Sequence, residues 1–207
     1  ILGVYTIRFD NRETGRKAIE NVVVMENIFY QRNITRSFDL KGSSRARYVD
    51  LGYKVENFDE ALARRRLARR FGGEEPAEAE QVSQVLMDDN LMELTKGRPF
   101  PLKHRAKLFF HKAVQNDTLF LSIVNVVDYS ILVGFDENTH EVVVGIIDYM
   151  RQYDIIKKME RMGKSVGMIA GQAEPTIIQP SQYRKRFSLA MERYFMTIPD
   201  KWITHES

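Results

Sequence analysis

Residues 126–150 read VVDYSILVGFDENTHEVVVGIIDYM, and this stretch decides the fold predicted for the chain. Two arms within it, 131–135 and 142–147, are apolar and rich in strand-forming residues. Between the arms, 136–140 is a short polar loop of residues that favour turns. The pattern therefore predicts one β-hairpin.

An aspartate lies at each end of this predicted hairpin. Folded about Asn138, a symmetrical register places Asp128 opposite Asp148, and Cα atoms of directly opposed residues lie roughly 4.5–5.5 Å apart. Two such carboxylates repel each other and are costly to desolvate, so a divalent cation, a bound proton or a catalytic role would explain them. Mg²⁺ is the natural candidate, because it takes one or two carboxylates together with substrate phosphates. On spacing alone, two solvated residues at strand ends are the alternative.

The 207 residues suffice for one large domain, or for one lobe of a larger one. The composition is globular, with 43% hydrophobic and 29% charged residues, no apolar run long enough to span a membrane and no stretch that resembles a signal peptide. Cysteine is absent, which excludes disulfides and thiolate metal sites and fits the cytosol. The net charge of +3 is mildly basic, so local clusters are more informative. Because Ile1 begins inside an apolar strand, we expect structured sequence before it.

Two N-terminal stretches, 1–9 and 19–29, are predicted to form an antiparallel pair of strands around a polar turn. After them, residues 38–47 read FDLKGSSRAR and gather basic groups about a Gly-Ser turn. Backbone N–H groups and cations in such a turn are suited to phosphate. A solvated turn is the alternative, and on this feature alone the more common one.

Helices are predicted from apolar periodicity and capping residues. One helix covers 58–70 with Asp59 as its N-cap, and its arginines suggest a solvated face more than a nucleic-acid or lipid contact. Residues 60–80 also read as a low-complexity insertion. Further helical segments are expected after a cap at 87–90, over 102–115, over 118–124 beyond a break at 116–117, and from Pro180-Ser181 onward.

The segment 151–180 is basic and amphipathic in its first part, which contains Lys157 and Lys158. This composition suits a segment that lies on an anionic membrane. Several glycines and two prolines in the remainder indicate a mobile loop. A helix that packs its Ile and Met residues on the domain is the alternative.

The order acid, hairpin, acid, long loop and helix is that of a phosphoryl-transfer lobe. One aspartate, Asp128, would orient the attacking hydroxyl, and the other, Asp148, would hold Mg²⁺ on the nucleotide phosphates. Few residues are needed, because such catalysis consists mainly of positioning and charge stabilisation.

Three motifs in this order resemble the phosphatidylinositol phosphate kinase family: FDLKGS at 38–43, VDYSILVG at 127–134 and VGIIDY at 144–149. Residues 171–178 and the helix that contains Tyr183 favour the phosphatidylinositol-3-phosphate 5-kinase branch. The resemblance covers almost the whole chain apart from residues 60–80.

The resemblance implies an α+β fold, a kinase-like C-terminal lobe of antiparallel strands and packed helices behind the last strands of a truncated N-terminal lobe. Residues 1–30 would form those late strands and the hinge. Residues 31–207 would form the C-terminal lobe, with an activation or specificity loop at about 149–180.

The same resemblance implies roles for individual residues. Asp128 would be the catalytic aspartate, and Asp148 would hold Mg²⁺ or Mn²⁺. The hinge backbone would meet the adenine of the co-substrate ATP, and basic residues would serve the lipid. The hinge residues are Glu26, Asn27 and Ile28; Lys41 and Arg47 would lie near the headgroup phosphate, and Lys157 and Lys158 would select the lipid and contact the membrane.

The implied activity is transfer of the ATP γ-phosphate to the 5-hydroxyl of phosphatidylinositol 3-phosphate, giving the 3,5-bisphosphate. It would take place on the cytosolic face of endosomal or vacuolar membranes, with an N-terminal lobe and further domains or scaffold proteins as partners and no nucleic acid. The family's phosphate-covering glycine loop and ATP-binding lysine have no counterpart in these residues. The 207-residue chain alone is therefore expected to be inactive.

Other functions stay open at this point. A kinase of the same family could use the 4- or 5-phosphate, or the chain could be a non-catalytic module that binds phosphoinositide. A phosphatase or nuclease built on the two carboxylates is less favoured, because the four histidines lack metal-ligand spacing and no GxSxG motif occurs. A protein kinase is disfavoured by the lack of HRD and DFG tripeptides.

Overall fold

The computed structural model describes residues 1–10, 15–43, 46–53, 55–71, 84–150, 153 and 179–199. Contacts between Cα atoms divide the chain into two compact units, Ile1–Asn33 and Ile34–Ser207. Each unit has its own sheet structure, and the mixture of strands and helices confirms the predicted α+β class.

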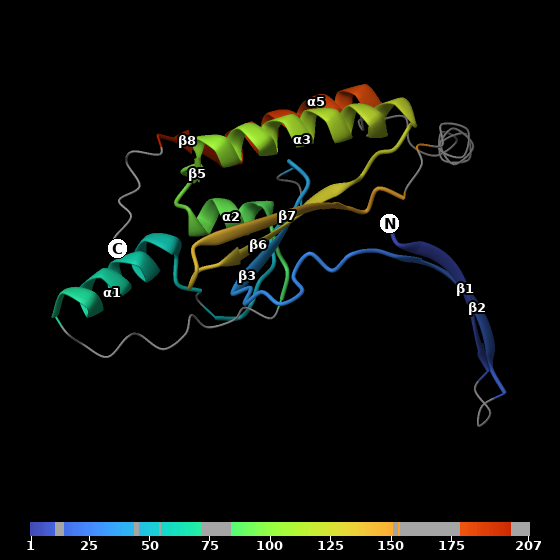
Figure 1. Ribbon diagram of the computed structural model, residues 1–207, viewed down its shortest axis with the longest axis horizontal. Helices are drawn as coiled ribbons and strands as arrows, with labels where there is room; N and C mark the ends of the chain where they lie inside the picture. Colours follow the sequence, from blue (N-terminus) through green and yellow to red (C-terminus); the bar gives the residue numbers. More distant parts are fainter. Residues whose placement is uncertain are drawn as a thin grey trace, which may run out of the picture. The chain divides into compact units, whose positions relative to one another are not determined.

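The first unit is an antiparallel pair of strands, β1 (Gly3–Asp10) and β2 (Lys17–Val24) (Figure 1). The pairing confirms the predicted hairpin, but the second strand ends five residues earlier than predicted. Asn27 causes the difference, because its side-chain oxygen accepts the N–H of Phe29 at 3.0 Å and its carbonyl accepts the N–H of Tyr30 at 3.0 Å. An asparagine that bonds to its own backbone in this way forms a turn and ends a strand.

The second unit contains a four-stranded sheet in the order β4-β3-β6-β7. Its strands are β3 (Arg36–Leu40), β4 (Leu86–Met87), β6 (Ser130–Asp136) and β7 (Glu141–Ile147). Strand β3 runs parallel to β4 and antiparallel to β6, which in turn runs antiparallel to β7. The ends of β3, β4 and β7 therefore lie at the sheet edge where β6 begins.

The predicted β6–β7 hairpin is confirmed, but its predicted register is wrong by one residue. Ser130 pairs with Ile147 and Asp136 with Glu141, so Asp128 does not stand directly opposite Asp148. The turn is the cause, since the Asp136 carboxylate accepts the N–H groups of Asn138 and Thr139 at 2.9 and 3.1 Å. These bonds centre the turn between residues 138 and 139 and not on Asn138.

The second unit also contains helices α2 (Asp88–Leu94), α3 (His104–Ile123) and α5 (Pro180–Tyr194). A parallel pair of short strands, β5 (Phe100–Lys103) and β8 (Phe195–Ile198), belongs to it too.

The predicted helix break at residues 116–117 is wrong, because α3 continues through it. Thr118 is fully buried and donates its hydroxyl to the Val114 carbonyl at 2.6 Å, while the polar residues 116 and 117 face solvent. Strands β5 and β8 were not predicted.

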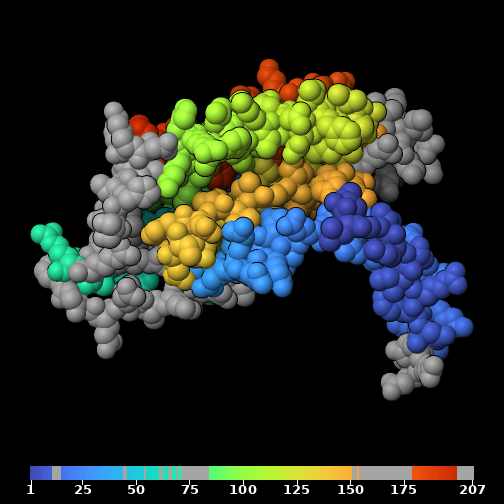
Figure 2. All heavy atoms as spheres, viewed as in Figure 1, coloured from blue at the N-terminus to red at the C-terminus, as the bar shows by residue number. Residues whose placement is uncertain are grey.

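Helices α3 and α5 lie side by side along the sheet (Figure 1). One buried cluster joins Phe38 and Leu40 of β3, Ile131 and Val133 of β6, and the inner faces of the helices, including Phe187. In Figure 2, α3 (green to yellow-green) borders the orange β7 strand on the visible face of this unit. Apolar residues of the strands and of the helices thus meet in one core.

Helix α1 (Phe58–Phe71) lies where a helix is predicted, but its N-cap is Asn57 and not Asp59. The Asn57 side chain accepts the N–H of Glu60 at 3.1 Å, as an N-cap does. Asp59 instead accepts a hydrogen bond from the guanidinium of Arg98 at 2.6 Å.

An ion pair with little exposure to solvent fixes the turn end of the hairpin to β3. Arg36 is 4% exposed, and its Nε lies 2.6 Å from the carboxylate of Glu137. The same arginine donates to the Glu56 carbonyl at 2.5 Å, and the hydroxyl of Thr35 donates to the Phe135 carbonyl at 3.0 Å. These polar groups are buried together, so each depends on the others.

We expect Glu137→Ala to lower the free energy of unfolding by about 3–5 kcal/mol, because the buried Arg36 would lose its charge partner. Chemical denaturation of the chain measures this change. Thr139→Ala, in the exposed turn of the same hairpin, is the control and should change stability by less than about 0.5 kcal/mol. Equal effects of the two substitutions would contradict a stabilising role for the ion pair.

Candidate active site at one edge of the sheet

The topology brings four polar residues to the edge of the sheet where β6 begins. Lys41 directly follows β3, Asp88 follows β4 and Asp148 follows β7, while Asp128 lies two residues before β6. Because β3, β4 and β7 all run toward this edge, the positions of these side chains follow from the strand order. The sequence predicted three of the four as site residues and missed Asp88.

The two predicted catalytic aspartates differ in environment. Asp128 is half-buried, whereas the Asp148 side chain is 58% exposed. Both have left-handed backbone conformations, with φ of +63° and +60°. Aspartate adopts this conformation more readily than most residues, and it occurs often at functional sites.

Two buried tyrosines hold the backbone beside Asp128. The hydroxyl of Tyr183, on α5, donates to the carbonyl of Tyr129 at 2.5 Å, and the two rings meet edge to face with centroids 4.7 Å apart. Burial raises the pKa of Tyr183, and the nearby negative charge of Asp128 acts in the same direction. The hydroxyl therefore stays protonated and remains a donor to the residue that follows Asp128.

Lys41 and Asp148, predicted as a substrate-binding residue and a metal ligand, lie together. The Lys41 ammonium is 3.6 Å from the Asp148 carboxylate, and the lysine side chain is 26% exposed. A pair that is this accessible to solvent contributes no more than about 1 kcal/mol. A phosphate or a metal ion can therefore separate the two groups at little cost.

Arg47, the other residue predicted to bind the headgroup, is engaged inside the protein. Its Nε donates to Asp88 at 2.8 Å, its Nη2 donates to the Asp39 carboxylate at 2.8 Å, and the side chain is 12% exposed. Burial alone would lower the pKa of Arg47, but hydrogen bonds and charge from Asp88 and Asp39 outweigh it and raise the pKa. These contacts favour a positioning role, and its contact with a headgroup phosphate stays a prediction.

The carboxylate of Asp88 also receives the backbone N–H groups that the sequence suggested for phosphate. Lys41 N donates to its two oxygens at 3.2 and 3.1 Å, and Gly42 N donates at 2.8 Å. Gly42 has a φ of +68°, and a Cβ there would lie 2.5 Å from the Cβ of Ala190 on α5. The turn therefore needs glycine, and an internal carboxylate occupies the anion position of its first two N–H groups.

The remaining predicted site residues fall into two groups. Glu26, Asn27 and Ile28 belong to the first unit, where Glu26 and Asn27 are exposed and Ile28 is half-buried next to the turn at Asn27. Lys157 and Lys158 lie outside the described residues. Their roles in binding nucleotide and lipid stay predictions.

The residues at this edge fit a magnesium ion that is completed by substrate. Among the described residues, no group of three or more acidic or histidine side chains could hold a metal by itself. Mg²⁺ is commonly bound through one or two carboxylates and substrate phosphates, so one accessible carboxylate is a sufficient protein contribution. The carboxylate of Asp148 already attracts a cation, the Lys41 ammonium, which stands where a metal ion would be attracted.

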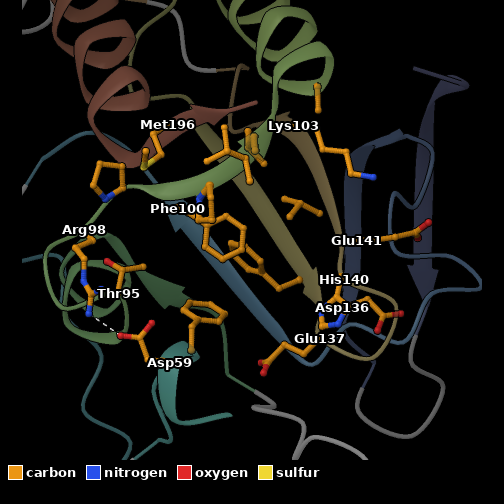
Figure 3. Close-up of a pocket in the computed structure, with 18 residues that line it drawn as sticks. Asp59, Thr95, Arg98, Phe100, Lys103, Asp136, Glu137, His140, Glu141 and Met196 are labelled. Carbon is orange, nitrogen blue, oxygen red and sulfur yellow. Dashed lines mark hydrogen bonds and ion pairs between the residues drawn. The ribbon is translucent and has the colours of Figure 1, made fainter. Parts of the chain in front are cut away.

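A cavity of about 930 Å³ lies at the other end of the hairpin (Figure 3). Phe100, Phe135 and Met196 contribute to its apolar wall, and Glu137 and His140 come from the turn between β6 and β7. None of the predicted site residues that the structure describes lines this cavity, so among them it is separate from the candidate active site.

We expect Tyr183→Phe to lower the free energy of unfolding by about 1–3 kcal/mol, because the buried Tyr129 carbonyl loses its donor. Thermal and chemical unfolding measure this change. Tyr53→Phe removes a hydroxyl from a tyrosine that is 54% exposed and is the matched control. If Tyr183→Phe were as stable as the control, the bond would not secure the Asp128 backbone.

Comparison with known proteins identifies the family. The family model described as phosphatidylinositol-4-phosphate 5-kinase matches residues 1–142 and 136–194. Across 98% of the chain, identity is 40% to the 1-phosphatidylinositol-3-phosphate 5-kinase FAB1A of Arabidopsis thaliana and 36% to the human 1-phosphatidylinositol 3-phosphate 5-kinase. Identity is 34% to FAB1 of Saccharomyces cerevisiae, also across 98% of the chain. The chain spans only 10%, 8% and 8% of the lengths of these relatives. The resemblance read from the three sequence motifs is confirmed: the chain belongs to the phosphatidylinositol-4-phosphate 5-kinase family, with sequence similarity to its 3-phosphate 5-kinases.

Proposed function

We propose that this chain is the C-terminal lobe and hinge of a lipid kinase that phosphorylates the 5-hydroxyl of phosphatidylinositol 3-phosphate. The observation that carries the proposal is the meeting of Lys41 with Asp148, 3.6 Å apart, at the sheet edge from which Asp128 also extends. This edge combines a half-buried carboxylate, an exposed carboxylate and a cation. Those are the groups that phosphoryl transfer requires.

In the proposed reaction, the Asp128 carboxylate accepts a hydrogen bond from the inositol 5-hydroxyl and takes its proton. The hydroxyl oxygen bonds to the γ-phosphorus of ATP as the bond from that phosphorus to the β-phosphate bridging oxygen breaks, leaving ADP. Asp148 would be the residue that holds Mg²⁺ (or Mn²⁺), and the ion would supply positive charge that offsets the negative charge of the phosphates. Lys41 moves its ammonium from Asp148 to a phosphate oxygen.

Substrate recognition is assigned to backbone and basic groups. The backbone at Glu26, Asn27 and Ile28 would meet the adenine of ATP. The headgroup would be met by Lys41, in the loop that Arg47 holds, and Lys157 and Lys158 would contact the anionic membrane and select the lipid. The relatives named 3-phosphate 5-kinases support phosphatidylinositol 3-phosphate over the 4- or 5-phosphate.

The proposed place of action is the cytosolic face of endosomal or vacuolar membranes, where the longer protein would bind peripherally with its N-terminal lobe and further domains or scaffold proteins. Within the described residues, no helix has both the length and the apolar character of a membrane span.

We expect Asp128→Asn, in the longest native protein that contains this chain, to reduce phosphate transfer by about 10²–10⁴-fold, because the amide cannot accept the hydroxyl proton. Transfer from labelled ATP to liposomes that contain phosphatidylinositol 3-phosphate measures this loss. Asp117→Asn, on the exposed side of α3, is the matched control and should retain activity. Equal thermal stability of the two variants would show that the loss is not unfolding. A normal rate in Asp128→Asn would contradict the catalytic assignment.

The same assay with different lipids separates the alternative functions. Product mainly from the 4- or 5-phosphate would retain the kinase reaction and overturn the proposed substrate. Liposome binding without transfer in the full-length protein would favour a non-catalytic phosphoinositide-binding module. Hydrolysis without ATP would favour a phosphatase or nuclease.

A further inference from the structure

Asp88 is a buried polar side chain beside the candidate site, and the proposed reaction does not use it. It is 1% exposed, and its two oxygens accept hydrogen bonds from three separate parts of the chain. These donors are the Lys41 and Gly42 backbone, the Arg47 guanidinium at 2.8 Å and the Tyr194 hydroxyl at 2.9 Å.

The donors lie on elements that are distant in sequence. Lys41 and Gly42 follow β3, Asp88 begins α2, and Tyr194 is the last residue of α5. Arg47 closes the loop that leaves β3, and its own carbonyl accepts the N–H of Asp89 at 3.0 Å. One carboxylate therefore fixes both ends of the loop that carries Lys41.

The Asp88 carboxylate is suited to this role because its two buried oxygens accept hydrogen bonds from all of these donors. Burial raises the pKa of Tyr194, and the negative charge of Asp88 raises it further, so the Tyr194 hydroxyl stays a donor. A buried carboxylate is tolerated only when hydrogen bonds and opposite charge compensate for its lost hydration. Removing its charge would therefore release several groups at once.

We propose that Asp88 is a positioning residue of the active site, which holds the Lys41–Gly42 backbone and thereby directs the Lys41 side chain to Asp148. The backbone bonds of residues 41 and 42 act directly on the loop, and the Lys41 ammonium reaches Asp148 from that anchored position. The role in catalysis rests on the proposed kinase function. The effect of Asp88 on the position of Lys41 is independent of that function.

The test variant is Asp88→Asn, which keeps the size of the side chain but puts an NH₂ group against N–H donors. The matched control is Asp89→Asn, the same substitution at the next residue, which is half-buried. A second control, Tyr194→Phe, removes one donor to Asp88 and leaves its bonds to the Lys41 loop intact. All three are made in the full-length protein.

The first measurement is hydrogen exchange at the Lys41 and Gly42 amides, which does not depend on turnover. We expect exchange to accelerate at least about tenfold in Asp88→Asn, corresponding to a loss of roughly one hydrogen bond per amide. Exchange should be unchanged in both controls. If these two amides exchanged in Asp88→Asn at the same rate as in the wild type, the proposal would be overturned.

The second measurement separates positioning from general stability. Without Lys41 beside it, Asp148 should bind Mn²⁺ about two- to fivefold more tightly, the gain expected from removing an accessible competing cation. Electron paramagnetic resonance of added Mn²⁺ measures this affinity. The rate of phosphate transfer should fall at the same time, since Lys41 no longer meets the phosphates. Partial unfolding would weaken both Mn²⁺ binding and transfer, so that result, or no change in either, would overturn the proposal.

The outcomes also separate this inference from the proposed function. If the wild-type protein binds Mn²⁺ but transfers no phosphate, the kinase proposal fails, and exchange and Mn²⁺ affinity alone decide the role of Asp88. If the wild-type protein binds no Mn²⁺ in the presence or absence of ATP, the metal role of Asp148 is overturned, and hydrogen exchange alone decides whether Asp88 positions the Lys41 loop.

Discussion

The buried carboxylate of Asp88 is the constraint on which the site edge depends. Burying an ionised carboxylate costs several kcal/mol unless hydrogen bonds and positive charge compensate. Here the compensation comes from the β3 loop, from Arg47 and from the end of α5. Each of these elements must approach Asp88 closely for the charge to be tolerated, so its burial and the shape of the site are set together.

The same requirement explains the glycine at position 42. The Lys41–Gly42 backbone can reach Asp88 only while it lies against α5, where Ala190 leaves no room for another Cβ. The Gly-Ser turn was suggested as a phosphate-binding loop because of its N–H groups, and two of those groups do bind an oxyanion. That oxyanion belongs to the protein, so the proposed contact of Lys41 with a substrate would be made by its side chain and not by its backbone.

The sequence predicted those features that repeat with a regular period or depend on neighbouring residues. Alternating and continuous apolar runs identified β1, β2, β6, β7 and the inner face of α5. The register of β6–β7 was missed because it depends on which backbone N–H groups the Asp136 carboxylate accepts. Both arms are continuous apolar runs, so their pattern does not choose between two registers that differ by one residue. The prediction divided α3 at residues 116 and 117 because they are polar, but both face solvent and the helix continues through them. Asp88 was missed because its partners at 41, 47 and 194 are remote in sequence, and only the order of the strands brings them together.

The candidate site contains one aspartate with a fixed backbone and one ion pair that is accessible to solvent. The backbone beside Asp128 is held by the buried Tyr183 hydroxyl, whereas Asp148 and Lys41 keep solvent access and form an ion pair with each other. A general base gains from a fixed position, since its geometry must match one hydroxyl. A metal ligand in this family of reactions needs less, because the phosphates of the nucleotide supply further oxygens. Among the described residues, no group of three or more acidic or histidine side chains could hold a metal ion. If Asp148 holds a divalent cation as proposed, the affinity of this edge for the cation would therefore depend on whether a polyphosphate is bound with it.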